Sequence, residues 1–293
     1  MLVIGSRGSQ LALWQAHWVQ ARLAALGLES RIEIIKTTGD RVTGVPLANV
    51  GGKGLFTKEI EDALLARQVD LAVHSLKDLP TEIPEGLQIA AIPERADPRD
   101  AIVGKRLSEL REGAKVGTSS LRRSAQLRRL RPDLQVESVR GNVDTRLRKL
   151  DERQYESIVL AVAGLDRLGW SSRIAEALDP EVMCPAVGQG ALAIETRTGE
   201  TVCAALDHAE TRAAVTAERA VLAALGGGCQ TPIGAHARVE GGRLSLLAVV
   251  LPPDGSECVK DRVEGAVGEA DALGRSLAET LLREGAGSLL RGR

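Results

Sequence analysis

A carboxylate beyond a buried strand is the first candidate for chemistry. The stretch Val73–Pro80 (Val-His-Ser-Leu-Lys-Asp-Leu-Pro) begins as the end of an apolar strand and continues into polar side chains. Ligands of α/β sheets bind beyond the carboxyl ends of strands, so Asp78 is a candidate catalytic residue, and Lys77 beside it favours its ionised form. The alternative is a strand-end turn that Asp78 only caps. We expect His74 to be a satisfied core histidine rather than a base.

A second candidate is an anion-binding turn at 117–123 (Gly-Thr-Ser-Ser-Leu-Arg-Arg), which has the pattern of a strand end, a small-residue turn and a helix start. The free N–H groups of a helix N-terminus, followed by Arg122 and Arg123, can bind carboxylates or phosphates. Simple helix capping is the alternative. Further arginines follow other strand ends, namely Arg7, Arg140 and Arg146. Because arginine binds such groups bidentately, we expect these side chains to face a solvated cleft for several anions.

One cysteine stands on a glycine-rich loop, in the sequence Gly-Gly-Gly-Cys-Gln-Thr-Pro-Ile-Gly at 226–234. Glycines let a bulky group approach the backbone, so Cys229 is a candidate nucleophile or attachment point, with an inert thiol as the alternative. The 4 cysteines of the chain form no Cys-x-x-Cys pair. We therefore expect neither a disulfide framework nor a metal site.

Two sheets are needed to position these residues. Apolar patterns predict strands at 2–5, 31–37, 69–74 and 87–92, with helices after Ser9 and Thr57. This order favours a mostly parallel sheet covered by helices. The first of these helices should end at Gly27. Its predicted apolar stripe consists of Leu11, Trp14, Trp18 and Ala21.

A second α/β unit follows, with strands predicted at 100–103, 115–117, 134–139 and 157–162 and helices at 119–131 and 143–153. Crossings at 93–98 and 185–190 join the two units, and 191–196 should return to the first as a strand. A third domain should hold a helix at 211–225, strands at 243–251 and 257–264, and a helix at 268–284. We expect two hinged lobes of doubly wound mixed sheet, resembling type II periplasmic binding proteins, plus a smaller C-terminal α+β domain. The expected divisions are 1–93 with 190–208, 97–185 and 211–293.

Composition narrows the class of protein. The 293 residues are 44% apolar and 26% charged, with a net charge of −1, which fits a globular protein and argues against disorder. The segment Lys105–Arg153 carries 14 Lys and Arg against 7 Asp and Glu. That excess indicates either an anion-binding face or a solvated helix face. No run of 18 apolar residues and no basic secretion signal occur, so we expect a cytoplasmic protein without a membrane partner.

Seven ordered stretches resemble the porphobilinogen deaminase family over nearly the whole chain. They are Ser6-Arg7 with Leu11–Gln15, Gly51–Phe56, His74–Asp78, Gly117–Arg123, Arg140–Asn142, Pro185–Gly190 and Gly228–Gln230. The resemblance implies a transferase that condenses four porphobilinogen molecules head to tail, releasing ammonia, and frees hydroxymethylbilane by hydrolysis. It also implies a dipyrromethane cofactor, held by a thioether to Cys229, and a monomeric enzyme of tetrapyrrole biosynthesis.

The same resemblance assigns roles to residues. Asp78 matches the catalytic carboxylate that stabilises positive charge on pyrrole nitrogens as ammonia leaves. The positions that match cofactor-binding residues are Lys53, Ser75, Lys77, Asp78, Ser120, Arg122, Arg123 and Cys229. Those that match substrate-binding residues are Arg7, Ser9, Phe56, Arg140, Arg146, Arg167 and Gln189.

Two other readings compete with this one. A two-lobed anion-binding protein without catalysis would share the lobes, although the missing export signal and a third domain with Cys229 argue against it. A nucleic-acid binder would use the basic helix Leu121–Arg131, but 3 Trp, 1 Tyr and 1 Phe offer few platforms for base stacking. We therefore expect no nucleic-acid partner.

Overall fold

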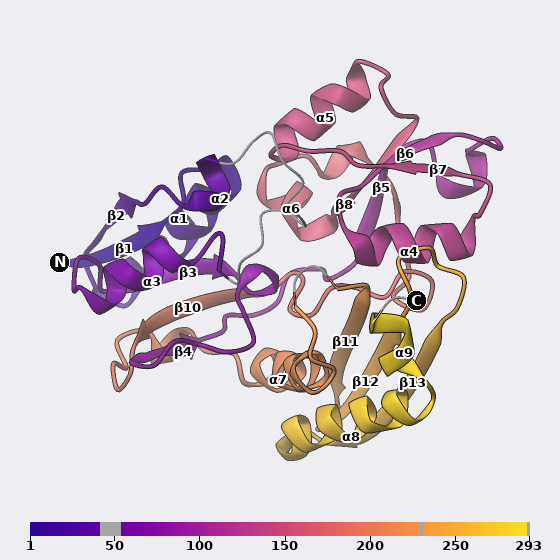
Figure 1. Ribbon diagram of the computed structural model, residues 1–293. Coiled ribbons are helices and arrows are strands. Elements are labelled where there is room, and N and C mark those ends of the chain that lie inside the picture. Colours follow the sequence, from indigo (N-terminus) through magenta and orange to yellow (C-terminus); the bar gives the residue numbers. More distant parts are fainter. Residues whose placement is uncertain (42–53, 229–230, 292–293) are drawn as a thin grey trace. The chain divides into compact units, whose positions relative to one another are not determined.

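A computed structural model describes residues 1–41, 54–228 and 231–291. The chain divides into two compact units, residues 1–95 with 191–212 and residues 96–190 with 213–293 (Figure 1). The first unit therefore contains two separate stretches of the chain. The second contains both the predicted second lobe and the predicted C-terminal domain.

The first unit is built on a five-stranded mixed sheet of order β2-β1-β3-β10-β4. Its strands are β1 (Leu2–Ser6), β2 (Ser30–Ile34), β3 (Leu71–Ser75), β4 (Leu87–Ala91) and β10 (Leu192–Arg197). Strand β1 runs parallel to β2 and β3, whereas β10 runs antiparallel to both β3 and β4. The predicted return of the chain as a strand near 191–196 is thus confirmed.

The α-helices among the described residues before β3 are α1 (Gln10–Ala25), α2 (Thr38–Arg41) and α3 (Lys58–Leu65). Ser9 caps α1, since its hydroxyl accepts the N–H of Ala12 at 3.3 Å, and Gly27 follows the helix with a φ of +77°. The predicted apolar stripe of α1 is wrong, because Trp14 is 37% exposed. The buried face consists of Gln15, Ala16, Val19 and Leu23. Apolar residues occur on most sides of this helix, so their spacing did not single out the core-facing side.

The second unit contains a sheet of the same design, of order β7-β6-β8-β5-β9. Its strands are β5 (Asp100–Gly104), β6 (Lys115–Gly117), β7 (Gln135–Glu137), β8 (Ser157–Ala161) and β9 (Ile174–Ala177). Strand β6 is parallel to β7 and β8, and β5 is antiparallel to β8 and β9. Helices α4 (Leu121–Leu130), α5 (Val143–Asp151) and α6 (Val162–Arg167) follow strands β6, β7 and β8. In each sheet, the antiparallel strand beside the three parallel strands directly follows a crossing between the units. This strand is β10 after residues 185–190 in the first sheet and β5 after residues 93–98 in the second.

The C-terminal part of the second unit is an antiparallel sheet of order β11-β12-β13. It consists of β11 (Ile233–Glu240), β12 (Arg243–Val250) and β13 (Val259–Ala266), with helices α7 (Ala209–Ala224), α8 (Ala270–Arg283) and α9 (Ala286–Arg291). Side chains alternate along β12. Leu246, Ala248 and Val250 face the core that the helices cover, whereas Leu247 and Val249 pack against Ala125 of α4. Strand β11 and helix α9 extend the two strands and two helices predicted for this domain.

Candidate active site

The turn after β3 presents the candidate carboxylate. Ser75 ends the strand, a single 3-10 turn covers Leu76–Asp78, and the side chain of Asp78 is exposed. Leu76 and Leu79 are buried and fix the turn on the core, with Lys77 half-buried between them. The Asp78 carboxylate is therefore held at the end of a rigid strand while it remains accessible to solvent.

A pocket at this strand end collects five of the predicted site residues of the first unit. They are Arg7, Ser9, Phe56, Ser75 and Asp78. Helix α1 lines the same pocket with Gln15, whose side-chain amide donates to the Ser75 hydroxyl at 2.8 Å. The sequence analysis did not find Gln15. The only signal for it in the sequence was its place in Leu11–Gln15, a stretch that carries the family resemblance.

Arg7 is oriented by a second residue that the sequence analysis missed. Its guanidinium donates to both carboxylate oxygens of Asp40, with the shortest bond at 2.5 Å, and lies over the Phe56 ring, 4.2 Å from the centroid. Partial burial raises the pKa of Asp40, but the hydrogen bonds from Arg7 and Thr37 outweigh it, so that pKa lies below its ordinary value. Arg7 is thus a cation fixed at the edge of the pocket that Asp78 lines.

His74 is the core histidine that the sequence indicated. It is 6% exposed, and its Nε2 lies 3.1 Å from Oε2 of Glu195, which is fully buried on β10. Glu61 of α3 is buried close to this pair. Burial, supported by the charge of Glu195, raises the pKa of Glu61 despite a hydrogen bond with Thr57 that lowers it. One carboxylate oxygen of Glu61 and one of Glu195 have no hydrogen-bond partner within the described residues.

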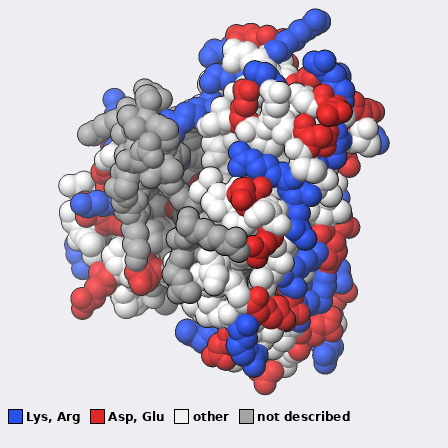
Figure 2. Space-filling view, turned by 45° about the vertical axis from the view of Figure 1, so that its right-hand side comes forward, with Lys and Arg blue, Asp and Glu red and all other residues white. Residues whose placement is uncertain are grey.

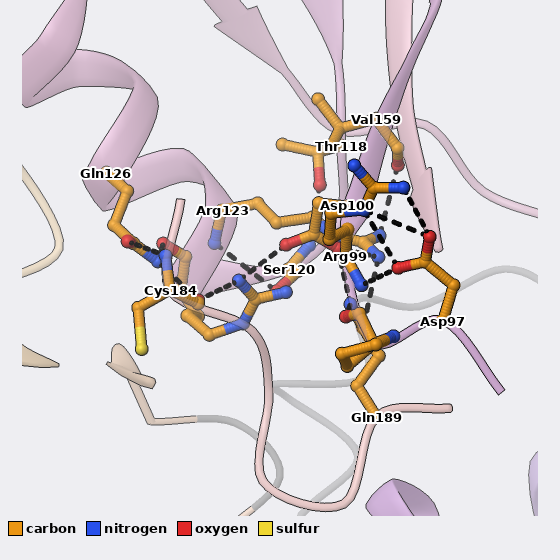
Figure 3. Close-up of polar contacts among 12 residues, drawn as sticks. Asp97, Arg99, Asp100, Thr118, Ser120, Arg123, Gln126, Val159, Cys184 and Gln189 are labelled. Carbon is orange, nitrogen blue, oxygen red and sulfur yellow. Dashed lines mark hydrogen bonds and ion pairs between the residues drawn. The ribbon is translucent and has the colours of Figure 1, made fainter. Parts of the chain in front are cut away.

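The second unit holds three of its predicted anion-binding residues, Arg122, Arg123 and Gln189, around one buried carboxylate (Figure 3). Asp100, the first residue of β5, is fully buried and accepts Nη1 of Arg122 at 2.7 Å and Nη2 of Arg123 at 2.7 Å. It also accepts Nε of Arg123 at 2.9 Å and the side-chain amide of Gln189 at 2.8 Å. Burial opposes the ionisation of Asp100, but the two guanidiniums outweigh that cost and hold its pKa far below the ordinary value.

The burial of Arg122 and Arg123 contradicts the expectation that they face solvent. Arg122 and Arg123 were expected to face a solvated cleft, yet they are only 3% and 6% exposed. They lie in the first turn of α4, whose N-cap is Ser120, with its hydroxyl accepting the N–H of Arg123 at 3.4 Å. The tight turn before α4 and the short β6 bring this helix start to the beginning of β5, so the arginines turn inward to Asp100.

Two of the remaining predicted arginines, Arg146 and Arg167, bind backbone carbonyls. The guanidinium of Arg167, at the end of α6, donates to Gly190 at 2.6 Å, and burial lowers its pKa to about 10. Arg146 donates to Gly141 at 2.8 Å, in the turn that leads from Arg140 into α5, and both of these arginines are half-buried. Two further predicted residues, Lys53 and Cys229, lie outside the described residues.

The three other cysteines are poor nucleophiles. Burial raises the pKa of Cys184 to about 12 and that of Cys203 to about 11. Burial also raises the pKa of Cys258, which is half-buried. Since the thiolate is the reactive form, none of these three sites favours thiol chemistry. Across the described residues, no group of three or more His, Cys, Asp or Glu side chains is placed to hold a metal ion.

Ion pairs neutralise part of the basic segment 105–153. Lys105 and Arg111 both pair with Glu156, at 2.9 and 3.0 Å, and Lys115 pairs with a glutamate of β7 at 2.9 Å. On the face shown in Figure 2, Lys and Arg lie interleaved with Asp and Glu. None of the described helices is long and apolar enough to cross a membrane.

Comparison with known proteins decides the family. A family model described as "Porphobilinogen deaminase, dipyromethane cofactor binding domain" matches residues 2–205, and one described as "Porphobilinogen deaminase, C-terminal domain" matches residues 212–283. This chain belongs to the porphobilinogen deaminase family. The porphobilinogen deaminase of Pelobacter propionicus is 52% identical over 99% of this chain and 96% of its own length, and that of Trichlorobacter lovleyi is 50% identical over 99% and 95%.

Solved structures give a weaker comparison for this porphobilinogen deaminase family member. A TRAP periplasmic solute binding protein from Desulfovibrio salexigens has a TM-score of 0.41 and 11% identity over 70% of this chain and 72% of its own. A periplasmic substrate-binding protein of an ABC transporter from Coxiella burnetii has a TM-score of 0.41 and 12% identity over 70% and 90%. Such scores carry no argument about function. The two mixed sheets themselves establish the α/β class of the fold.

Proposed function

We propose that this chain condenses four porphobilinogen molecules head to tail, releasing ammonia at each addition, and then frees hydroxymethylbilane by hydrolysis. The observation that carries the proposal is the pocket beyond β3, where Asp78, Ser75 and Arg7 converge in a member of this family. The pocket offers one accessible carboxylate beside one fixed cation. That pair suits a substrate with a pyrrole N–H and carboxylate side chains.

Asp78 is proposed as the catalytic group. Loss of ammonia from porphobilinogen leaves positive charge shared with the pyrrole nitrogen. A carboxylate fixed within hydrogen-bond reach of that N–H stabilises the charged species more than the neutral substrate, and only this difference accelerates the step. The buried leucines on either side of the turn keep the carboxylate in place, so little reorganisation is needed when the charge develops.

A dipyrromethane is two joined pyrroles with two carboxylates each, so its binding needs groups that hold anions. In the second unit, one buried aspartate is set against two guanidiniums, and Nε of Arg122 is buried without a hydrogen-bond partner. A cofactor carboxylate would satisfy both the surplus charge and this N–H. When bound, the cofactor supplies the pyrrole carbon to which the first substrate is joined.

Cys229 is proposed as the attachment point of the cofactor. The raised pKa values of Cys184, Cys203 and Cys258 disfavour the thiolate at each alternative. We further propose a cytoplasmic monomer.

The mass of the intact protein tests this proposal. A thioether survives acid denaturation, so active protein should exceed its sequence mass by two pyrrole units. Cys229→Ser should lack the increment and be inactive, while the matched control Cys258→Ser should keep both. Active protein of bare sequence mass would contradict the covalent primer. Binding of porphobilinogen without release of ammonia would instead identify a non-catalytic anion-binding protein.

A further inference from the structure

Asp100 is a buried charge that the proposed chemistry does not use. Four hydrogen bonds converge on its carboxylate, two from Arg123 and one each from Arg122 and Gln189, all between 2.7 and 2.9 Å. These three donors are among the side chains proposed to bind cofactor and substrate. Asp100 therefore touches the binding residues rather than the ligand.

The donors of the two arginines are used to different extents. Arg123 gives Nε and Nη2 to Asp100 and Nη1 to the carbonyl of Val159 at 3.0 Å (Figure 3). Arg122 gives Nη1 both to Asp100 and to the carbonyl of Cys184 at 2.5 Å, but its Nε has no partner. A buried N–H without a partner is costly, so this edge of Arg122 indicates a ligand that accepts it.

The charges of the cluster indicate the kind of ligand. Two buried guanidiniums face one buried carboxylate, which leaves one positive charge without a counter-ion inside the cluster. The N-terminus of α4 adds a positive partial charge at the same place, because both arginines lie in its first turn. A buried excess of positive charge is stabilised by an anion that can also accept hydrogen bonds.

We infer that Asp100 is a positioning residue, which fixes Arg122, Arg123 and Gln189 and leaves the Nε–H of Arg122 for a carboxylate of the pyrrole chain. This inference rests on the proposed function and adds a residue to it. Without the Asp100 charge, two adjacent guanidiniums would repel each other and would no longer share a negatively charged acceptor. The orientation needed for a bidentate contact with a ligand would then be lost.

Loading of the cofactor-free chain tests the inference. Protein made without cofactor is incubated with increasing porphobilinogen, and the mass increment is followed over time. For Asp100→Asn, the concentration that gives half-maximal loading should rise by about tenfold or more, because charge-assisted contacts are misplaced. The maximal loading rate should change by less than about threefold, since Asp78 is untouched. Asp97→Asn is the matched control, because Asp97 makes equally short bonds of 2.6–3.0 Å to Arg99 alone.

Each outcome of this experiment has one meaning. A folded Asp100→Asn protein that loads at the parent's concentration would overturn the positioning role, as would a lower melting temperature with unchanged loading. A parent chain that gains no increment would instead refute the proposed function.

A second measurement tests the inference even if the Asp100→Asn protein does not fold. In protein labelled with 15N-arginine, the Nε–H signal of Arg122 should differ between the loaded parent and cofactor-free Cys229→Ser. The Nε–H signal of Arg123 should stay in place, because Asp100 holds it in both states. An unchanged Arg122 signal, or a shifted Arg123 signal, would contradict the inference.

Discussion

At the scale of single residues, the charge of Asp78 can be separated from its shape. Asp78→Asn keeps the size of the side chain, so the protein should fold, while turnover should fall by about two orders of magnitude or more. Asp78→Glu keeps the charge but displaces it by about a methylene, so it should retain more activity than the amide. Steady-state turnover measures both, with Asp62→Asn, an exposed site on α3, as the control. An amide variant as active as the parent would leave Asp78 only a turn-capping role.

Glu61 should make stability depend on pH. Its pKa is raised chiefly by burial, so the folded state disfavours its ionised form. Glu61 therefore contributes fully to stability at a pH below its pKa in the unfolded chain. This contribution is lost as the pH rises through its higher pKa in the folded protein. Glu61→Gln should raise the melting temperature by about 1–3 °C at about pH 8, with the gain vanishing towards about pH 4. Thermal melts at both pH values measure this, and a gain that is larger in acid would show the sign to be wrong.

At the scale of elements, the sequence predicted more of the framework than of the contacts. Short apolar runs were enough to predict five strands, because a strand buried on both faces is mostly apolar along its length. These strands are β1, β3, β5, β8 and β10. Strand β11 was not, since Ile-Gly-Ala-His-Ala-Arg-Val-Glu contains few strong strand formers and its pairing with β12 is what extends it. Asp100 was placed correctly at a strand start, but its partners come from α4 and a later crossing, and no local spacing reveals them.

The two crossings lie side by side within the second unit. The N–H of Ala96 donates to the carbonyl of Gly190 at 3.2 Å, and the Gln189 amide donates to Pro98 at 2.7 Å. Gly190 has a φ of +87°, and an added Cβ would lie 2.4 Å from the Ala96 carbonyl oxygen. Here glycine meets both a backbone requirement and a close approach of two chains.

Gly190→Ala should therefore lower the free energy of unfolding by about 1–3 kcal/mol. Gly199→Ala is the matched control, with a φ of +85° but no atom within 4 Å of the added Cβ. Urea denaturation of the two variants separates the cost of the backbone conformation from that of the steric clash. If both variants lost the same free energy of unfolding, the two crossings would have to move apart at Gly190 without cost.

At the scale of the whole molecule, burial decides which binding residues could be recognised from the sequence. Five predicted residues meet in one pocket of the first unit, because side chains that follow neighbouring strand ends share one edge of a sheet. In the second unit the same logic found Arg122 and Arg123 but not the buried charge that holds them. Sequence patterns identify groups that can contact a ligand, whereas their internal partners depend on packing between distant segments.

The position of β10 also constrains how the chain is made. Among the described strands, β4 pairs only with β10, and β10 ends at Arg197. On a ribosome that adds about 5–20 residues per second, β4 therefore waits for roughly 5–20 s before its neighbour emerges. All five strands of the sheet from β5 to β9 emerge in that interval, so the sheet that starts later can close first. Until then the nascent chain exposes the open edges of β3 and β4, which makes this interval its period of greatest exposure to aggregation and to chaperones.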